Sequence, residues 1–170
     1  LRLANDRELL KIDVVAYPLM GEDGRKLMAD NRELLNKYRN RLKIGGWKMI
    51  LDGSPQGRSA WMSEPYEGGE EGYCAYPWIK PEQAEAFALE AVNDGLQLLT
   101  HCNGDAASEL FIDSYAKALE ASDNPEKDSL RPVMIHCQTV RNDQLDRMAR
   151  LDMIASIFVG HVYYWGDVHL

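Results

Sequence analysis

The chain has 170 residues, of which 45% are hydrophobic and 27% charged, and this composition is typical of one globular domain with its own core. The formal net charge of −8 argues against nucleic-acid or anionic-membrane partners, since both need a basic face. No apolar run approaches the roughly 18 residues of a membrane span, and the first residues show no signal-peptide pattern.

The cysteines indicate the compartment. Cys74, Cys102 and Cys137 have no CxxC spacing, and an odd number is a poor basis for a disulfide framework. This pattern favours a reducing compartment, so we expect a cytoplasmic protein. The chain opens on Leu1 rather than on a methionine, which favours a piece cut from something longer.

Apolar runs alternate with helical patterns in the first half of the chain. Residues 12–17 (IDVVAY) are rich in β-branched side chains and predict a strand. Residues 24–42 carry leucines at helix-like spacings and predict a helix, and residues 47–51 (WKMIL) predict a buried strand. Residues 53–77 predict a loop rich in glycine, serine, glutamate and aromatic residues, and loops of this length are usually functional or disordered.

The second half repeats the alternation. Pro81 fits the first turn of a helix, where its missing N–H costs nothing, and Gly95 fits the stop of that helix. Asp105 and Asn142 fit the N-caps of two further helices. Further strands are predicted at residues 96–100, 132–135 and 153–159.

The fold class follows from this order of elements. Five apolar strands separated by helical segments predict βαβ units of an α/β protein, with a parallel sheet covered on both faces. Two architectures fit, an open doubly wound sheet and part of a (β/α)8 barrel. Length alone favours the open sheet, because a whole barrel usually takes about 250 residues.

Three histidines, His101, His136 and His161, each follow one of the apolar runs. The carboxyl ends of parallel strands are where ligands bind and catalytic groups converge. One isolated histidine there is more often a hydrogen-bonded structural group, but three at successive strand ends favour a metal site. Cys102 and Cys137 each follow a histidine, so we expect them on the opposite face as small apolar residues.

Lys48 lies in the middle of an apolar strand pattern. A buried ammonium is costly unless it is paired, so this position needs an explanation. One interpretation is a salt bridge to Asp52, and another is burial as a neutral amine with a lowered pKa. A neutral lysine can also take up CO2 to become a carbamate, an anionic ligand able to bridge two metal ions. On the residues alone, the salt bridge is favoured.

The chain resembles the amidohydrolase superfamily in four separated stretches, WKMILDGSPQGRSAWMSEPY, LLTHCNGDAA, RPVMIHCQTV and MIASIFVGHVYYWGDVH. Within it, the branch of N-substituted formamide deformylases and exoenzyme regulatory proteins is the most similar. The resemblance implies a partial (β/α)8 TIM barrel, about units 3 to 7, with parallel strands and covering helices. Residues 1–170 would then be a single partial barrel domain, truncated at both ends.

The resemblance also implies a metal site. Lys48 matches a strand-four lysine that is carbamylated in some members, His101 the strand-five metal histidine and His136 the strand-six one. The implied cofactor is one or two divalent ions, with zinc the first choice, which lower the pKa of a bound water toward about 7 for attack on a carbonyl. Because this chain supplies few ligands, we expect it to bind metal weakly or not at all.

Substrate contacts and missing segments follow from the same resemblance. Arg58 and Tyr66 fall in the strand-four loop, where substrate contacts are expected. His161 matches no universal ligand, although it occurs in a subgroup with a HVYYWGD-like stretch. The family's strand-one His-x-His pair and strand-eight aspartate are both missing, and Asp167 follows His161 too closely to be that aspartate.

The function implied is a metal-dependent hydrolase that acts on C–N bonds of small amide or formamide-like substrates in an intact parent, the isolated chain being inactive. A non-catalytic α/β binding or scaffold module with structural histidines is the alternative. A phosphotriester or lactone hydrolase on the same scaffold is a second enzymatic alternative. The uncovered strand edges at residues 12–17 and 153–159 predict a homo-oligomer.

Overall fold

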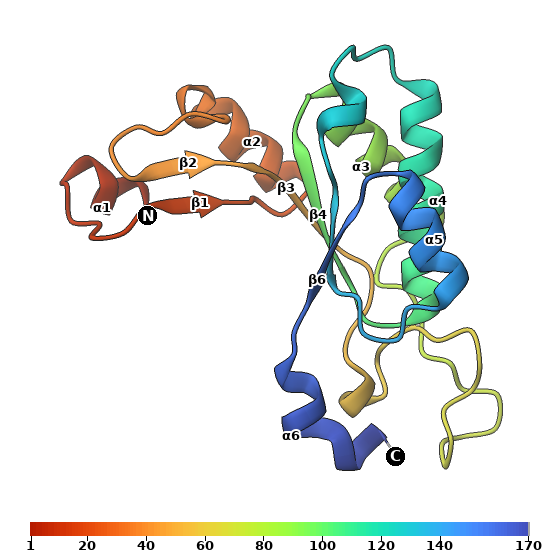
Figure 1. Cartoon of the computed structure of the whole chain (residues 1–170). Coiled ribbons are helices and arrows are strands. Elements are labelled where there is room, and N and C mark those ends of the chain that lie inside the picture. The colour runs from red at the N-terminus through yellow and green to blue at the C-terminus, as the bar shows by residue number, and fades with distance from the viewer. Residues whose placement is uncertain (170) are drawn as a thin grey trace.

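A four-stranded parallel sheet forms the centre of the molecule (Figure 1). The structure is a computed structural model that describes residues 1–169, with side chains as far as Asp167. The strands lie in chain order, which is the order expected of successive βα units. They are β3 (Gly46–Ile50), β4 (Gln97–Cys102), β5 (Val133–His136) and β6 (Ile154–Ile157).

A shorter strand pair extends this sheet beyond β3. β1 (Val14–Ala16) pairs in parallel with β2 (Leu42–Ile44), and Leu19 then bridges to Lys48 of β3. Ala16 pairs with Ile44, and Leu19 pairs with Lys48. Two residues lie between the first partners of these pairs and three between the second, so the segment that joins β2 to β3 carries a one-residue bulge around Gly45. The segment from β1 to Leu19 therefore lies parallel to the segment from β2 to β3 as a fifth strand, in agreement with the five predicted strands.

The helix predicted over residues 24–42 is wrong in its second half. α2 (Glu22–Asp30) ends early and is followed by the short 3₁₀ turn η1 (Arg32–Leu34) and then by β2. Asparagines interrupt the leucine pattern, and Asn36 and Asn40 adopt left-handed backbone with φ of 50° and 51°. Asparagine tolerates this conformation better than most residues, so the chain turns here and returns beside β1.

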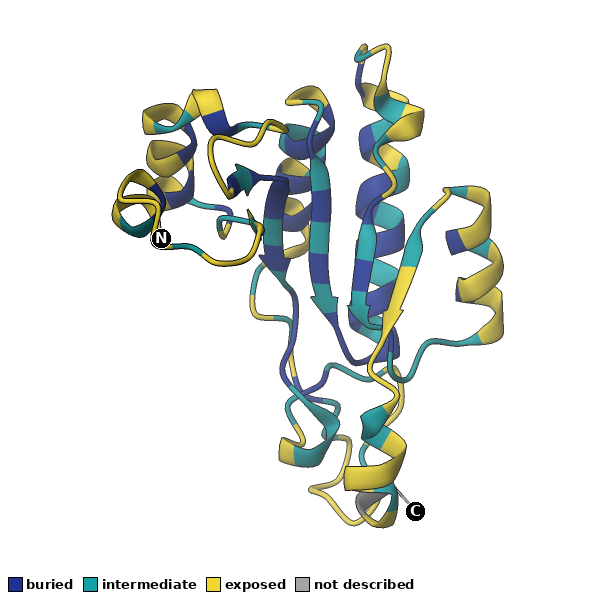
Figure 2. Cartoon of the chain, turned by 60° about the vertical axis from the view of Figure 1, so that its left-hand side comes forward, coloured by how far each residue is buried: buried dark blue, intermediate teal, exposed yellow. Residues whose placement is uncertain are grey.

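Helices cover one face of the sheet. α3 (Pro81–Asn93), which has the predicted bounds, and α4 (Asp105–Ala121) pack on β3 and β4, and α5 (Asn142–Arg150) packs on α4 (Figure 2). Along β4, Leu98 and Cys102 are fully buried on this face, whereas Leu99 and His101 are half-buried on the other. No helix packs on that second face within the described residues, so the expected cover on both faces is not found there.

The remaining elements lie at the ends of the molecule. α6 (Gly160–His169) follows β6, so His161 lies in the first turn of a helix and not at a strand end as predicted. The short elements are α1 (Arg2–Asp6), η2 (Pro55–Gly57) and η3 (Lys127–Ser129). No helix among residues 1–169 has both the length and the apolar character needed to cross a membrane.

Substitution of two glycines tests the close approach of β3 to β4. Gly46 has a φ of +158°, and a Cβ there would lie 1.9 Å from the backbone oxygen of Gln97. We expect Gly46→Ala to lower the free energy of unfolding by about 2 kcal/mol or more, because backbone must move. The control is Gly166→Ala in α6, where an added Cβ meets no atom within 4 Å. Urea denaturation that gives both variants the same midpoint would contradict this packing.

Candidate active site

Imidazole rings gather at the carboxyl edge of the sheet. The ring centroids of His101 on β4 and His136 on β5 are 4.5 Å apart, with the rings edge to face. The His161 ring stacks on His136 at 5.6 Å between centroids, and the Phe158 ring packs edge to face with His161 at 4.9 Å. The structure therefore brings the three predicted histidines into one row, although their roles stay predictions.

The backbone at the end of β5 turns the His136 ring toward His101. In register, His136 lies opposite Cys102, whose side chain is fully buried against the helices. His136 and Cys137 both adopt left-handed backbone, with φ of 74° and 50°, which interrupts the alternation of a regular strand. Non-glycine residues in this region are uncommon, and such strain clusters at functional sites.

His101 is held by the loop that follows β3. Its Nε2 lies 3.0 Å from the carbonyl oxygen of Gly53 and 3.0 Å from Nδ2 of Asn103. Because the Gly53 carbonyl can only accept, a hydrogen on Nε2 would donate to it, and Nδ1 of His101 would then keep its lone pair available for a ligand. A hydrogen on Nδ1 would instead leave Nε2 to accept from the Asn103 amide.

His136 is neutral at physiological pH. Burial lowers its pKa to about 4, with further lowering by the positive charge of His101, His161 and Lys48. Its Nδ1 is buried and has no hydrogen-bond partner among the described residues. A neutral imidazole with an unpartnered nitrogen is the form that binds divalent ions. The chemistry of this pair therefore fits a metal ion.

Lys48 lies on β3 with its side chain half-buried, and burial lowers its pKa to about 8. It forms no ion pair with Asp52 in the described structure. The Asp52 carboxylate is instead fully buried and accepts backbone N–H groups from Trp61, Asn103 and Gly104 at 2.7–3.0 Å. The favoured salt bridge is therefore wrong, because Asp52 lies beyond the end of β3 and is bound to the loops.

The protein donors are fewer than a tight metal site needs. Within residues 1–169, no group of three or more histidine, cysteine, aspartate and glutamate side chains is arranged to hold a metal ion. Four protein ligands are usual in structural zinc sites and three in catalytic ones. His101, His136 and Lys48 would have to be joined by further groups.

A cleft of about 1080 Å³ opens beside His136 and His161, and His101 and Lys48 are not among its described lining residues. One wall comes from the loop after β3, and the others come from the end of β5 and from the segment through α6. The candidate residues Arg58, Tyr66, His136 and His161 all line it, and most of its remaining wall is carbon. The apolar lining residues are Met62, Ile157, Phe158, Val159 and Val162.

Arg58 and Tyr66 use their polar groups inside the loop. The Arg58 guanidinium donates to the carbonyl oxygens of Gly68 at 3.1 Å and Glu67 at 3.4 Å. The Tyr66 hydroxyl donates to the carbonyl of Ala60 at 2.7 Å, and burial raises its pKa to about 12. Both residues therefore shape the cleft wall, and their predicted contact with substrate stays a prediction.

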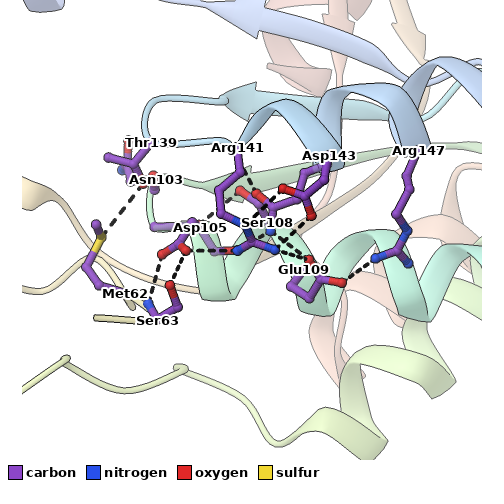
Figure 3. A network of polar contacts seen from close by, with 12 residues as sticks. Met62, Ser63, Asn103, Asp105, Ser108, Glu109, Thr139, Arg141, Asp143 and Arg147 are labelled. Atoms are coloured by element: carbon purple, nitrogen blue, oxygen red, sulfur yellow. Dashed lines mark hydrogen bonds and ion pairs between the residues drawn. The ribbon is translucent and has the colours of Figure 1, made fainter. Parts of the chain in front are cut away.

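A polar network ties the loop after β3 to α4 and α5 (Figure 3). Asp105 on α4 accepts hydrogen bonds from the backbone N–H of Ser63 at 2.8 Å and from Arg141 at 2.9 Å. Arg141 also pairs with Glu109 at 2.9 Å, and Glu109 pairs in turn with Arg147. These roles could not be predicted from the sequence, because the partners lie far apart in the chain and their pairing has no periodic signal.

Two predicted N-caps are displaced by one residue. Gly104, not Asp105, is the N-cap of α4, and Arg141, not Asn142, is the N-cap of α5. The Asp105 carboxylate is committed to the loop and to Arg141 instead of to its own helix.

Comparison with known proteins identifies the family. The whole chain, residues 1–170, matches the amidohydrolase family. It belongs to that family. Protein LONG AFTER FAR-RED 3 of Arabidopsis thaliana is 30% identical over 121 residues, which are 71% of this chain and 20% of that protein. The putative amidohydrolase YtcJ of Bacillus subtilis is 25% identical over 127 residues, which are 73% of this chain and 23% of that protein.

Two solved structures share the fold of this amidohydrolase chain. Both are uncharacterized metal-dependent hydrolases, from Pyrococcus horikoshii (24% identity) and Pyrococcus furiosus (26% identity), each with a TM-score of 0.77. The match covers 98% of this chain but 32% and 33% of those chains. The predicted fold class, a partial (β/α)8 barrel with parallel strands and covering helices, is confirmed. The chain spans about a third of the solved structures and about a fifth of the curated relatives that it matches.

A pH titration of stability tests the burial of His136. Its folded pKa of about 4 lies below the ordinary value of 6.5, so the unfolded chain binds more protons between these two values. Stability contributed by neutral His136 is therefore complete above about pH 6.5 and is lost as the pH falls toward about 4. Urea denaturation from neutral pH downward should show a shallower loss of stability for His136→Asn than for the unchanged chain. Equal slopes would mean that His136 titrates freely.

Proposed function

We propose that this chain is the metal-binding segment of an amidohydrolase that cleaves C–N bonds in small amide-type substrates, formamide-like ones in particular. The observation that supports this proposal most directly is the contact between the rings of His101 and His136 at the carboxyl ends of adjacent strands. The Nδ1 of His136 is buried there and has no hydrogen-bond partner among the described residues. The amidohydrolase family and the metal-dependent hydrolases among the solved structures support this proposal.

His101 and His136 would hold a divalent ion, and imidazole donors favour zinc. A bound ion supplies a Lewis acid for a carbonyl oxygen and a water of lowered pKa. The chain's own contribution is orientation. The carbonyl of Gly53 holds Nε2 of His101, and the left-handed backbone holds the His136 ring beside it. Arg58 and Tyr66 shape the cleft wall on which the substrate would rest, and His161 lines the same cleft beside His136.

Lys48 would serve as a carbamate. Its lowered pKa makes the free amine accessible near neutral pH, and the half-buried position lies on the same sheet face as His101. The amine nitrogen bonds to the carbon of CO2 and loses a proton, which leaves an anionic carboxylate end. That end adds the oxygen donor that the histidine pair lacks.

We further propose that residues 1–170 form a portion of a single barrel domain. The chain spans about a third of the solved structures that share its fold. Other strands of the barrel would supply the family's His-x-His pair and its acid/base aspartate, so this segment alone is inactive. The free thiols of Cys74, Cys102 and Cys137 agree with a cytoplasmic location.

Metal titration of the chain tests the site. We expect weak binding of Co²⁺ or Zn²⁺, followed by absorption and by calorimetry, with the dissociation constant raised about tenfold in His101→Asn and in His136→Asn. Lys48→Ala should weaken binding only in buffers that contain bicarbonate. Lys117→Ala, which removes a surface ion pair with Glu85, is the matched control.

Affinities that do not change in any of these variants would favour the alternative, a non-catalytic binding or scaffold module with structural histidines. The reaction itself is tested in a longer protein that carries this segment. Amides and formamides should be hydrolysed and lose turnover in Lys48→Ala. Preferred turnover of phosphotriesters or lactones would place the enzyme in the other hydrolase class.

The uncovered edge of β6 supports the proposal that the isolated chain forms a homo-oligomer. β6 is the last strand of the described sheet and has no charged residue. Its last residue, Ile157, is 62% exposed, and Val159, Val162 and Tyr163 after it are 81–84% exposed. Light scattering should show a dimer or larger species, since open apolar edges template pairing. Ile157→Lys should shift the equilibrium toward monomer, and a monomer of the unchanged chain at every concentration would refute self-association.

A further inference from the structure

The loop after β3 is anchored unevenly. Its first stretch is bound to the sheet, because the backbone N–H of Trp61 donates to Asp52 and that of Ser63 donates to Asp105. From residue 64 to residue 77, the hydrogen bonds of the described structure stay inside the loop. Contact with the sheet resumes at Trp78, whose N–H donates to the carbonyl of Leu51 at 2.7 Å.

The outer loop, residues 64–77, continues directly from Ser63. Tyr66 and Glu67 in this segment line the cleft, and Arg58 binds the carbonyls of Glu67 and Gly68 across it. These bonds, together with those from the Met62 N–H to the Cys74 carbonyl and from the Tyr66 hydroxyl to the Ala60 carbonyl, join the outer loop to residues 58–62 as a single unit. Its position over the cleft is therefore set at its attachment points, of which Ser63 is the last before the turn.

Asp105 is built to hold that attachment. Its side chain is 7% exposed, and it accepts hydrogen bonds from both the backbone N–H and the hydroxyl of Ser63. Arg141 donates to the same carboxylate, so the negative charge that is buried there is paired (Figure 3). If Asp105 were removed, Arg141 would still be paired with Glu109 and Asp143, and the contact of α4 with α5 would remain.

We propose that Asp105 is a positioning residue for the cleft: through Ser63 it sets how the outer loop, residues 64–77, closes over the substrate. This inference rests on the proposed function only in taking the cleft as the substrate site. Asp105 contacts neither the histidines nor Lys48 in the described structure, so its effect passes through the loop. Loss of Asp105 should free the loop without disturbing the sheet.

Hydrogen–deuterium exchange of the whole chain tests the proposal without metal or substrate. In Asp105→Ala, we expect amides of residues 64–77 to exchange about tenfold faster, while amides of β4 and β5 keep their rates. Asp105→Asn keeps an acceptor for the Ser63 N–H, so it should restore most of the protection. The matched control is Glu109→Ala, which removes contacts to Arg141 and Arg147 in the same network but none to the loop.

Unchanged exchange of the loop in Asp105→Ala would overturn the proposal, and so would an equal increase in Glu109→Ala. If Asp105→Ala does not fold, Ser63→Ala carries the same test, because it removes only the hydroxyl donor from an exposed residue. A severalfold increase confined to the loop is then expected. In an active longer protein, Asp105→Ala should raise KM more than it lowers kcat, and Asp105→Asn should recover most of the loss. If the titration shows no metal binding, the exchange result is unaffected. The two experiments can therefore reject the metal site and the role of Asp105 independently.

Discussion

The buried carboxylate of Asp52 organises the carboxyl edge of the sheet. It has no exposed surface and accepts three backbone N–H groups, one from the loop after β3 and two from the turn before α4. Burial raises its pKa, while the three hydrogen bonds lower it and offset some of the cost of the buried charge. Since one side chain binds both loops, they cannot move independently. The orientation of His101 follows, because Gly53, its partner, is the next residue.

The strained end of β5 completes the same arrangement. Left-handed backbone at His136 and Cys137 costs about 1–3 kcal/mol for each residue, yet it directs one ring toward His101 and the thiol into the core. Two backbone hydrogen bonds beyond the end of the strand stabilise this strained conformation. The Cys137 N–H donates to the Cys102 carbonyl at 3.2 Å, and the Thr139 N–H donates to the Asn103 carbonyl at 3.1 Å. The imidazole pair is therefore held in place by the chain itself, which is the condition for precise ligand geometry.

Local patterns predicted the elements but not the contacts between them. The strand with Lys48 and the helix over residues 81–93 follow from apolar runs, Pro81 and Gly95, all of which act locally. The partner of Lys48 was predicted wrongly, because a spacing of four residues places Asp52 on its face only if the strand continues, and β3 ends at Ile50. The pairing of Asp105 with Ser63 and Arg141 spans 42 and 36 residues, and it depends on loop paths for which the sequence has no periodic signal.

The division of the sheet into two faces explains how the chain keeps reactive groups available. Along β4, the side chains that face α3 and α4 are buried, whereas His101 on the other face is half-buried. A fully buried Lys48 would need a charged partner, and a fully exposed one would keep its ordinary pKa of 10.5. Half-burial gives a value of about 8, at which the amine is partly neutral without a counter-ion. An apolar cover on this open face would lower the pKa of Lys48 and of His136 further, since desolvation is the largest cause of both shifts, whereas a carboxylate placed there would raise them.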